Sequence, residues 1–110
     1  MYIYRLQILS SKSCSEEQLN NIIGVSSNFL YANWGIEIIQ SGENFSEILV
    51  YFLSLLEGKY EKLESIGISR ENISIWILYE YEGQCNMEYD PESMKKLGES
   101  GILLCILEFF

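Results

Sequence analysis

Histidine is absent from this 110-residue chain, and its absence removes several kinds of chemistry at once. Without an imidazole there is no Ser-His or Cys-His nucleophile pair, and none of the usual zinc sites that contain histidine. Cysteine occurs only 3 times, with no pair at C-x-x-C spacing. An odd number of scattered cysteines indicates reduced thiols rather than a disulfide framework, so we expect a cytoplasmic protein.

Basic residues are also scarce. The chain has 7 Lys and Arg against 16 Asp and Glu, which gives a formal net charge of -9. Nucleic acids and anionic membrane surfaces are bound through a surplus of Lys and Arg, so neither is an expected partner. The longest strongly apolar stretches, such as 48–56, are well short of the roughly 20 residues that a membrane-spanning helix needs. The charge fits a basic protein partner best.

Motifs for common cofactors are missing as well. Asp90 is the only aspartate, so the chain cannot form a calcium loop of alternating Asp and Asn. It contains no glycine-rich phosphate-binding loop either. We therefore expect no metal and no organic cofactor.

The chain does contain alternating strand and helix patterns. Tyr4, Leu6 and Ile8 are separated by polar residues, which is typical of a strand with one buried face. Ser15, followed by acids, and Gly24 mark the two ends of a short helix. Further strands are predicted over 34–39, 73–81 and 102–110, and further helices over 45–67, with a kink or break at Gly58, and from Pro91 to Gly98 or Gly101.

The pattern also predicts where some residues and strands lie within these elements and within the sheet. Asn44 is predicted to cap the long helix, and Met94 and Leu97 are predicted to be the inward residues of the last helix. Strand 73–81 is expected in the middle of the sheet, because it is rich in β-branched and aromatic residues. Strand 102–110 is nearly all apolar, so we expect it to be covered on both faces or to lie in mid-sheet.

The order of these elements predicts one α+β domain over residues 1–110. Its mixed sheet has four strands, or five if 85–89 adds a short one, and its helices pack on one face of that sheet.

The arrangement resembles a known family in features spread over most of the chain. They are the helix from Ser15 to Gly24, the aromatic strand near Trp34, the helix from Ile48 to Leu63, the strand from Ile73 to Ile77, and the segment from Asp90 through Met94 to Gly98 and Leu104. The family consists of small bacterial proteins known only as an uncharacterised domain. Acidic families of this size also look like the immunity proteins of toxin systems such as contact-dependent growth inhibition. The resemblance rests on caps and core residues, so it implies an architecture and no active site.

Segment 71–92 contains more than a third of the acids in the chain and no Lys or Arg. Tyrosine interleaved with carboxylates suits a basic protein surface, because rigid aromatic area is combined with complementary charge. A solvated hairpin is the alternative, and helix capping alone would explain Asp90 and Glu92. The acids are Glu71, Glu80, Glu82, Glu88, Asp90 and Glu92, and the tyrosines are Tyr79, Tyr81 and Tyr89.

The open face of the sheet is a second candidate surface. If the apolar positions of the first strand and of 73–81 face the helices, Trp76 and Leu78 face away from them, as a binding or dimer patch would. Alternatively, the loop 25–33 folds over this face. The other residues that would face away are Arg5, Gln7, Glu37, Ser74 and Glu80.

Catalysis has weaker support. Glu80 and Glu82 lie on one face of a strand, where exposed acids are ordinary. Cys14 precedes a helix N-terminus, whose dipole lowers the pKa of a thiol, but the chain offers it no histidine, so an incidental thiol is favoured. Cys105 is most simply a small core residue. We therefore expect no enzymatic activity.

The preferred hypothesis is an immunity protein that binds a basic bacterial toxin domain, for example a nuclease, and occludes its active site. The alternative is a structural or regulatory interaction domain, with a homodimer through the open sheet face as one form. A small-molecule enzyme ranks third. The predicted contact residues are Trp76, Glu80, Glu82, Glu88, Tyr89 and Asp90.

Overall fold

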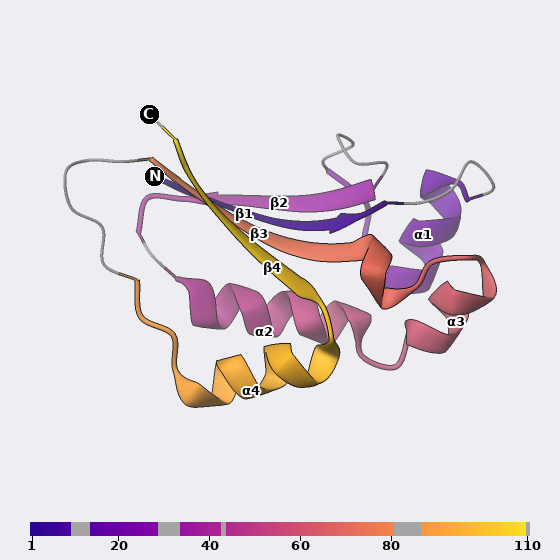
Figure 1. Cartoon of the computed structure of the whole chain (residues 1–110). Helices are drawn as coiled ribbons and strands as arrows, with labels where there is room; N and C mark the ends of the chain where they lie inside the picture. Colours follow the sequence, from indigo (N-terminus) through magenta and orange to yellow (C-terminus); the bar gives the residue numbers. More distant parts are fainter. Residues whose placement is uncertain (10–13, 29–33, 43, 81–86, 110) are drawn as a thin grey trace.

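The computed structural model describes residues 1–9, 14–28, 34–42, 44–80 and 87–109 (Figure 1). One four-stranded sheet has the order β2-β1-β3-β4, in which β1 pairs antiparallel with β2 and β3, and β3 pairs parallel with β4. The predicted α+β fold with a mixed sheet is confirmed. In chain order the elements are β1 (Tyr2–Ile8), α1 (Glu16–Ile23), β2 (Trp34–Gln40), α2 (Phe45–Leu56), α3 (Tyr60–Ser65), the 3-10 helix η1 (Arg70–Asn72), β3 (Ile73–Glu80), α4 (Pro91–Ser100) and β4 (Leu103–Phe109).

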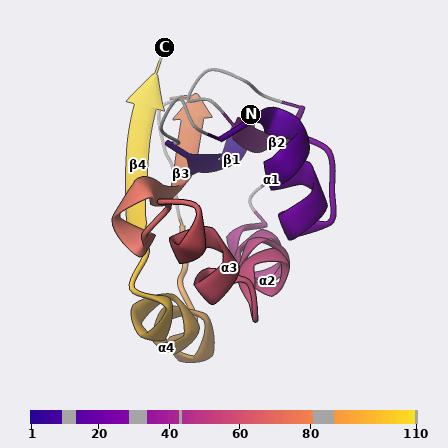
Figure 2. The same ribbon diagram turned by 90° about the vertical axis from the view of Figure 1, so that its right-hand side faces the viewer.

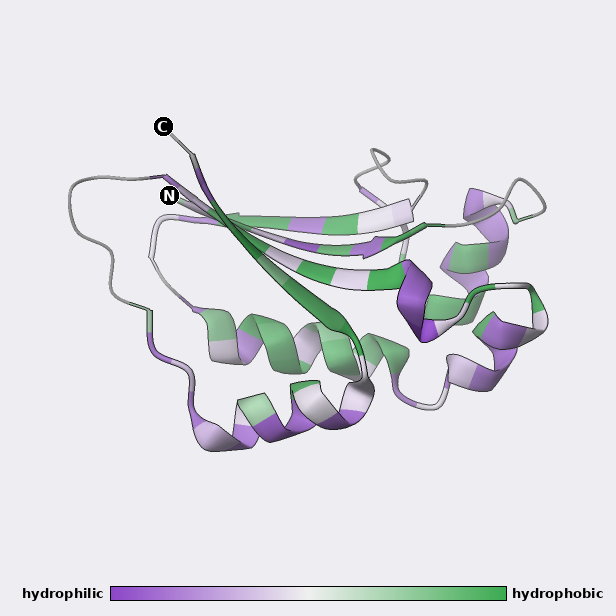
Figure 3. Ribbon diagram, viewed as in Figure 1, coloured by the Kyte–Doolittle hydropathy of each residue, from purple (hydrophilic) through white to green (hydrophobic). Residues whose placement is uncertain are grey.

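Helices and sheet form two layers. Helices α2 and α4 lie side by side below one face of the sheet, and α1 and α3 lie at the end where β2 and β3 begin (Figures 1 and 2). Helix α2 is apolar along most of its length, whereas α4 is largely hydrophilic (Figure 3). The core therefore lies mainly between α2 and the sheet. Its members include Tyr4, Leu6, Ile8, Phe45, Ile48, Leu49, Phe52, Leu56, Ile73, Ile75 and Ile77.

Local signals place several helix ends where the sequence predicts them. The Ser15 hydroxyl accepts a hydrogen bond from the Gln18 N–H at 3.1 Å, which begins α1. Gly24 ends that helix with φ +93° and Gly58 separates α2 from α3 with φ +75°. Residues with a side chain rarely adopt such positive φ angles, so glycine at these points stops each helix.

The start of α2 differs from the prediction, because the Asn44 side chain makes no capping bond to the helix. The Asn44 carboxamide instead donates to Glu47 at 3.3 Å, and the Asn44 backbone N–H donates to the Tyr4 hydroxyl at 2.9 Å. A buried strand residue thus satisfies an amide at this helix end. Asn44 therefore stands at the predicted N-cap position, but the predicted capping bond from its side chain was wrong.

Helix α4 is rotated relative to the prediction. Met94 is 51% exposed, while Ser93 is buried and Leu97 is partly buried. Ser93, Leu97 and Ser100 are spaced by four and three residues and form the inward stripe. Met94 as an inward residue was therefore wrong, because the stripe that faces inward runs through Ser93, one position before it.

The short 3-10 helix η1 was not predicted. The Arg70 guanidinium lies over the Tyr60 ring, 4.1 Å from its centroid, and donates to the Ser100 carbonyl at 3.1 Å. Arg70 thus links α3 to the end of α4. The optional fifth strand at 85–89 does not form over 87–89, and residues 85 and 86 lie outside the described part.

Strand β3 is internal, as predicted, because it pairs with β1 on one side and with β4 on the other. Strand β4 contradicts its prediction. It forms an edge of the sheet, where Leu103 is 64% exposed and Ile106 and Leu107 are about half exposed. The other side of β3 is already occupied by β1, so the crossover through α4 adds β4 at the outside.

Candidate functional site

Alternate residues of all four strands point away from the helices, and we call this surface the open face. The pairing register aligns its residues in rows across the sheet. Trp76 and Leu78 lie in neighbouring rows of it, on the face that the sequence indicated. One row is Glu37, Arg5, Trp76 and Cys105, and the next is Ile39, Ile3, Leu78 and Leu107.

Polar groups on the open face bond to one another. The Arg5 Nε donates to a Glu37 carboxylate oxygen at 2.7 Å, and both side chains are 22% exposed. The Trp76 indole N–H donates to the Ser74 hydroxyl at 2.8 Å. Because these groups are satisfied within the sheet, the area left for a partner is mainly aliphatic and aromatic.

Cys105 lies on this face, opposite Trp76, and is partly buried rather than part of the core, which corrects its prediction. The alternation of side chains along β4 gives Leu104 the side facing the helices and leaves Cys105 facing away. The sequence left open that the loop 25–33 folds over this face. Residues 29–33 of that loop lie outside the described residues, so this alternative stays a prediction.

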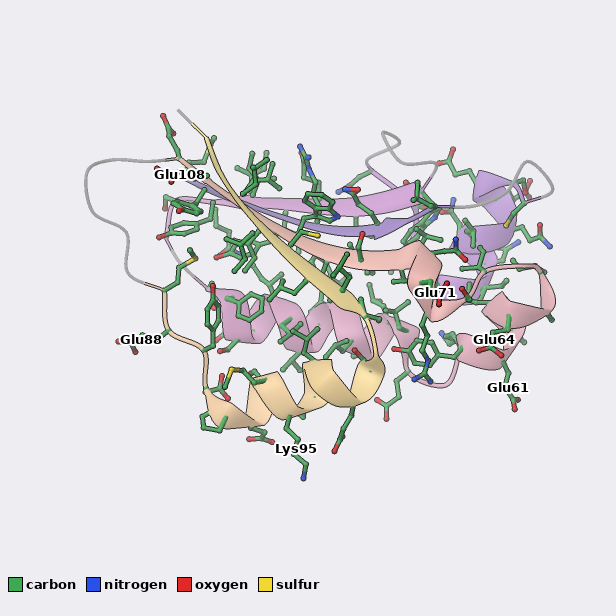
Figure 4. All side chains as sticks on the ribbon, viewed as in Figure 1. Glu61, Glu64, Glu71, Glu88, Lys95 and Glu108 are labelled. Atoms are coloured by element: carbon green, nitrogen blue, oxygen red, sulfur yellow. The ribbon has the colours of Figure 1, made fainter. Side chains whose placement is uncertain are left out.

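Three acidic side chains lie at the end of the molecule where β3 and β4 end, two of them on these strands and Glu88 in the helix layer just before α4 (Figure 4). We call Glu80, Glu88 and Glu108 the acidic end; Glu80 is on the open face, and Glu88 and Glu108 lie at the same end of the molecule (Figure 4). The Tyr79 hydroxyl donates to the Glu108 carboxylate at 3.4 Å. No ion pair joins these three acids to Lys or Arg in the described part of the chain. The charges of these three carboxylates are therefore not neutralised by a Lys or Arg ion pair within that part of the chain.

Tyr89 and Asp90 belong to the helix layer. The Tyr89 ring meets Phe45 edge to face, with ring centroids 5.0 Å apart. Asp90 accepts from the Ser93 N–H at 3.1 Å and from the Ser46 hydroxyl at 2.6 Å, so it caps α4 and ties it to α2. The structure thus separates these two residues from Trp76 and Glu80. Glu82 lies outside the described residues.

The same hydrogen bonds explain the acidity of Asp90. Bonds from Ser46 and Ser93 lower the pKa of Asp90 from 3.8 to about 2, because they favour the carboxylate over the neutral acid. Asp90 therefore stabilises the fold fully above pH 3.8, and this contribution is lost as the pH falls toward 2.

We expect Asp90→Asn to weaken the pH dependence of stability in that interval. Asparagine keeps an oxygen that accepts the capping bonds but does not titrate. Urea unfolding midpoints between pH 3.8 and about 2 measure the effect, with Glu92→Gln in the same first helical turn as the control. An Asp90→Asn variant whose midpoint falls as steeply as that of the wild type would contradict the assignment.

Carboxylates also line the surface between α2 and α4. A groove of about 490 Å³ is bordered by Leu53, Tyr60 and Glu99, and a hollow of about 380 Å³ beside it includes Glu47 and Asp90. A general acid at neutral pH needs a raised carboxyl pKa, and the pKa of Asp90 is shifted in the opposite direction. Helix capping accounts for Asp90 without any catalytic role.

Cys14 is partly buried, and burial raises the pKa of its thiol. This direction is opposite to the lowered pKa that the sequence suggested for a thiol before a helix N-terminus. A raised pKa leaves less thiolate at neutral pH. Cys14 therefore fits an incidental thiol.

No family model, curated protein or solved structure matches the chain. In the described part of the chain, no helix combines the length and apolar character needed to cross a membrane.

Proposed function

We propose that the protein is a cytoplasmic immunity protein that binds a basic bacterial toxin domain, for example a nuclease, and occludes its active site. One observation carries the proposal: an apolar sheet face with satisfied polar groups ends at Glu80, at the same end of the molecule as Glu88 and Glu108, and no ion pair joins these acids to Lys or Arg among the described residues. The protein acts by binding and carries out no reaction on the toxin.

Both parts of this surface have a physical role. A groove that attracts phosphate also attracts Glu80 and its acidic neighbours, and long-range charge speeds the encounter of the two proteins. Trp76 and Leu78 then supply the desolvated contact that slows dissociation.

Tyr89 and Asp90 act indirectly in this proposal. Their contacts with Phe45 and Ser46 anchor the two residues that directly follow Glu88 to α2. They are positioning residues for the acidic end, while Glu80 and Glu88 contact the toxin. Glu82 remains a proposed contact residue, and this proposal rests on the sequence alone.

The proposal predicts a neighbouring upstream gene for a large secreted protein with a basic C-terminal domain, and that domain is the partner for the test. We expect wild-type protein to bind that domain tightly, and Glu80→Lys combined with Glu88→Lys to weaken the affinity at least about 100-fold. Like charges would then face each other at the contact. Isothermal titration calorimetry at low and high salt measures the change.

Glu61→Lys with Glu64→Lys is the matched control. It changes the net charge equally, but both residues lie on α3, at the other end of the molecule from Glu88 and Glu108 (Figure 4). We expect the control to slow association while the affinity stays within about 10-fold of wild type. Equal losses from the two double variants, or no binding by the wild type, would refute the proposed surface.

A further inference from the structure

The two edges of the sheet differ in whether side chains occupy their outward backbone groups. At the β2 edge, the Ser27 hydroxyl accepts from the Gly35 N–H at 3.1 Å and donates to the Gly35 carbonyl at 2.8 Å. The Asn28 carboxamide accepts from the Glu37 N–H at 2.7 Å and donates to the Glu37 carbonyl at 3.1 Å. These side chains occupy backbone groups that another strand would need for pairing.

The β4 edge has no such cover. Among the described residues, no side chain or loop bonds to the backbone of β4 on its outer side. Residues 103–107 include no charge and no proline, and their apolar side chains are exposed on both faces of the sheet. Edge strands usually carry charge, proline, a bulge or a cover to prevent pairing, so a long bare edge indicates a partner strand.

We propose that β4 pairs antiparallel with β4 of a second copy of this chain, about a two-fold axis at Cys105. A two-fold interface uses the same patch on both subunits, and an edge strand meets itself only in the antiparallel direction. The two four-stranded sheets then form one continuous sheet.

In this register, apolar residues of one copy lie opposite apolar residues of the other. Residues directly opposite each other in an antiparallel pair point to the same face. Leu103 of one copy meets Leu107 of the other on the open face, and Leu104 meets Ile106 on the helix side. The most exposed apolar side chains of β4 are thus covered in pairs.

Charge restricts a second copy to an uncharged part of the surface, and β4 in this register provides one. The chain carries a net charge of -9, so two copies repel wherever acidic surfaces meet. Residues 103–107 are uncharged, and Glu108 of one copy lies opposite residue 102 of the other. The two Glu108 backbones are then separated by six strand positions, or about 20 Å, which exceeds the Debye length of about 10 Å at 0.1 M salt.

The dimer is expected to be weak. Contact between two edge strands is smaller than a standard interface of about 800 Å² per partner, so association depends on protein concentration. This inference goes beyond the proposed immunity function and requires no toxin.

Sedimentation velocity over a concentration series tests the pairing. We expect wild-type protein to shift from monomer to dimer as its concentration rises, and Leu107→Lys to raise the dissociation constant at least about 30-fold, because two Lys side chains enter an apolar contact. Ile39→Lys is the control on β2, since Ile39 is exposed on the same face at the capped edge. Circular dichroism checks that each variant is folded.

A wild-type protein that stays monomeric, or an Ile39→Lys variant that dissociates as readily as Leu107→Lys, would overturn the proposal. A dimer whose dissociation constant is unchanged by Leu107→Lys would also overturn the proposal.

Disulfide trapping tests the register in a Cys14→Ser, Cys85→Ser background. We expect copper phenanthroline in air to join the two Cys105 thiols into a covalent dimer, the oxidant accepting two electrons and the thiols releasing two protons. Moving the thiol with Cys105→Ser and Leu107→Cys should abolish cross-linking, because equivalent positions then lie four residues apart, about 13 Å. Equal cross-linking of the two proteins would refute the axis at Cys105.

Discussion

Replacing Trp34 with alanine is expected to lower the free energy of unfolding by about 3–5 kcal/mol. Trp34 is fully buried at the start of β2, and its indole N–H donates to the Asn20 side-chain oxygen at 2.8 Å. The same oxygen accepts from the Ser27 N–H at 3.0 Å. Alanine would therefore leave a large cavity and also remove the hydrogen bond that links the start of β2 to Asn20 on α1.

Urea titrations followed by far-UV circular dichroism measure this loss. Trp34→Phe is the control, because it removes the indole N–H but keeps most of the apolar volume, and we expect a smaller loss from it. An alanine variant as stable as the phenylalanine variant would show that packing of the ring is not the main contribution of Trp34.

We expect Phe52→Ala, in the middle of α2, to lower the free energy of unfolding by about as much as Trp34→Ala. Phe52 is fully buried between the helix and the sheet, so its removal should lower the free energy of unfolding by about 3–5 kcal/mol. For a domain of this size, each 1 kcal/mol corresponds to a shift in melting temperature of about 4 °C or more. Differential scanning calorimetry should therefore record a fall of about 12 °C or more.

The neighbouring aromatic residue supplies the matched control. Tyr51 is 41% exposed on the same helix, so Tyr51→Ala should change the free energy of unfolding by no more than about 0.5 kcal/mol. Both substitutions remove an aromatic ring and place alanine, a good helix former, in α2. Equal effects of the two substitutions would contradict the orientation of α2 against the sheet.

Short-range patterns predicted the elements well. Ser15 and Gly24 bound α1 as expected, and Gly58 divides the long helical pattern into α2 and α3. Each of these signals acts on backbone groups only a few residues away. Asn44 occupies the predicted N-cap position, but its side chain makes no capping bond, and its own backbone N–H donates to the Tyr4 hydroxyl, forty residues away in sequence.

The candidate surface was predicted in part. Alternation along β3 correctly placed Trp76 and Leu78 on the face away from the helices. Proximity in sequence suggested one patch for all the acids of 71–92, but Tyr89 and Asp90 pack on α2 while Glu80 ends a strand. The chain leaves the sheet between these residues, and sequence spacing does not record that change of layer.

Composition and local pattern were enough for the fold class, the charge, the absence of imidazole chemistry and the faces of β1 and β3, because these depend on residue type and on the two- and 3.6-residue periods. Strand order was not accessible in this way. The apolar character of β4 is compatible with the middle of a sheet or with an unprotected edge, and the choice depends on whether β1 already occupies the other side of β3. Pairing between strands distant in sequence therefore placed an apolar strand at the surface, where it became the most informative feature of the molecule.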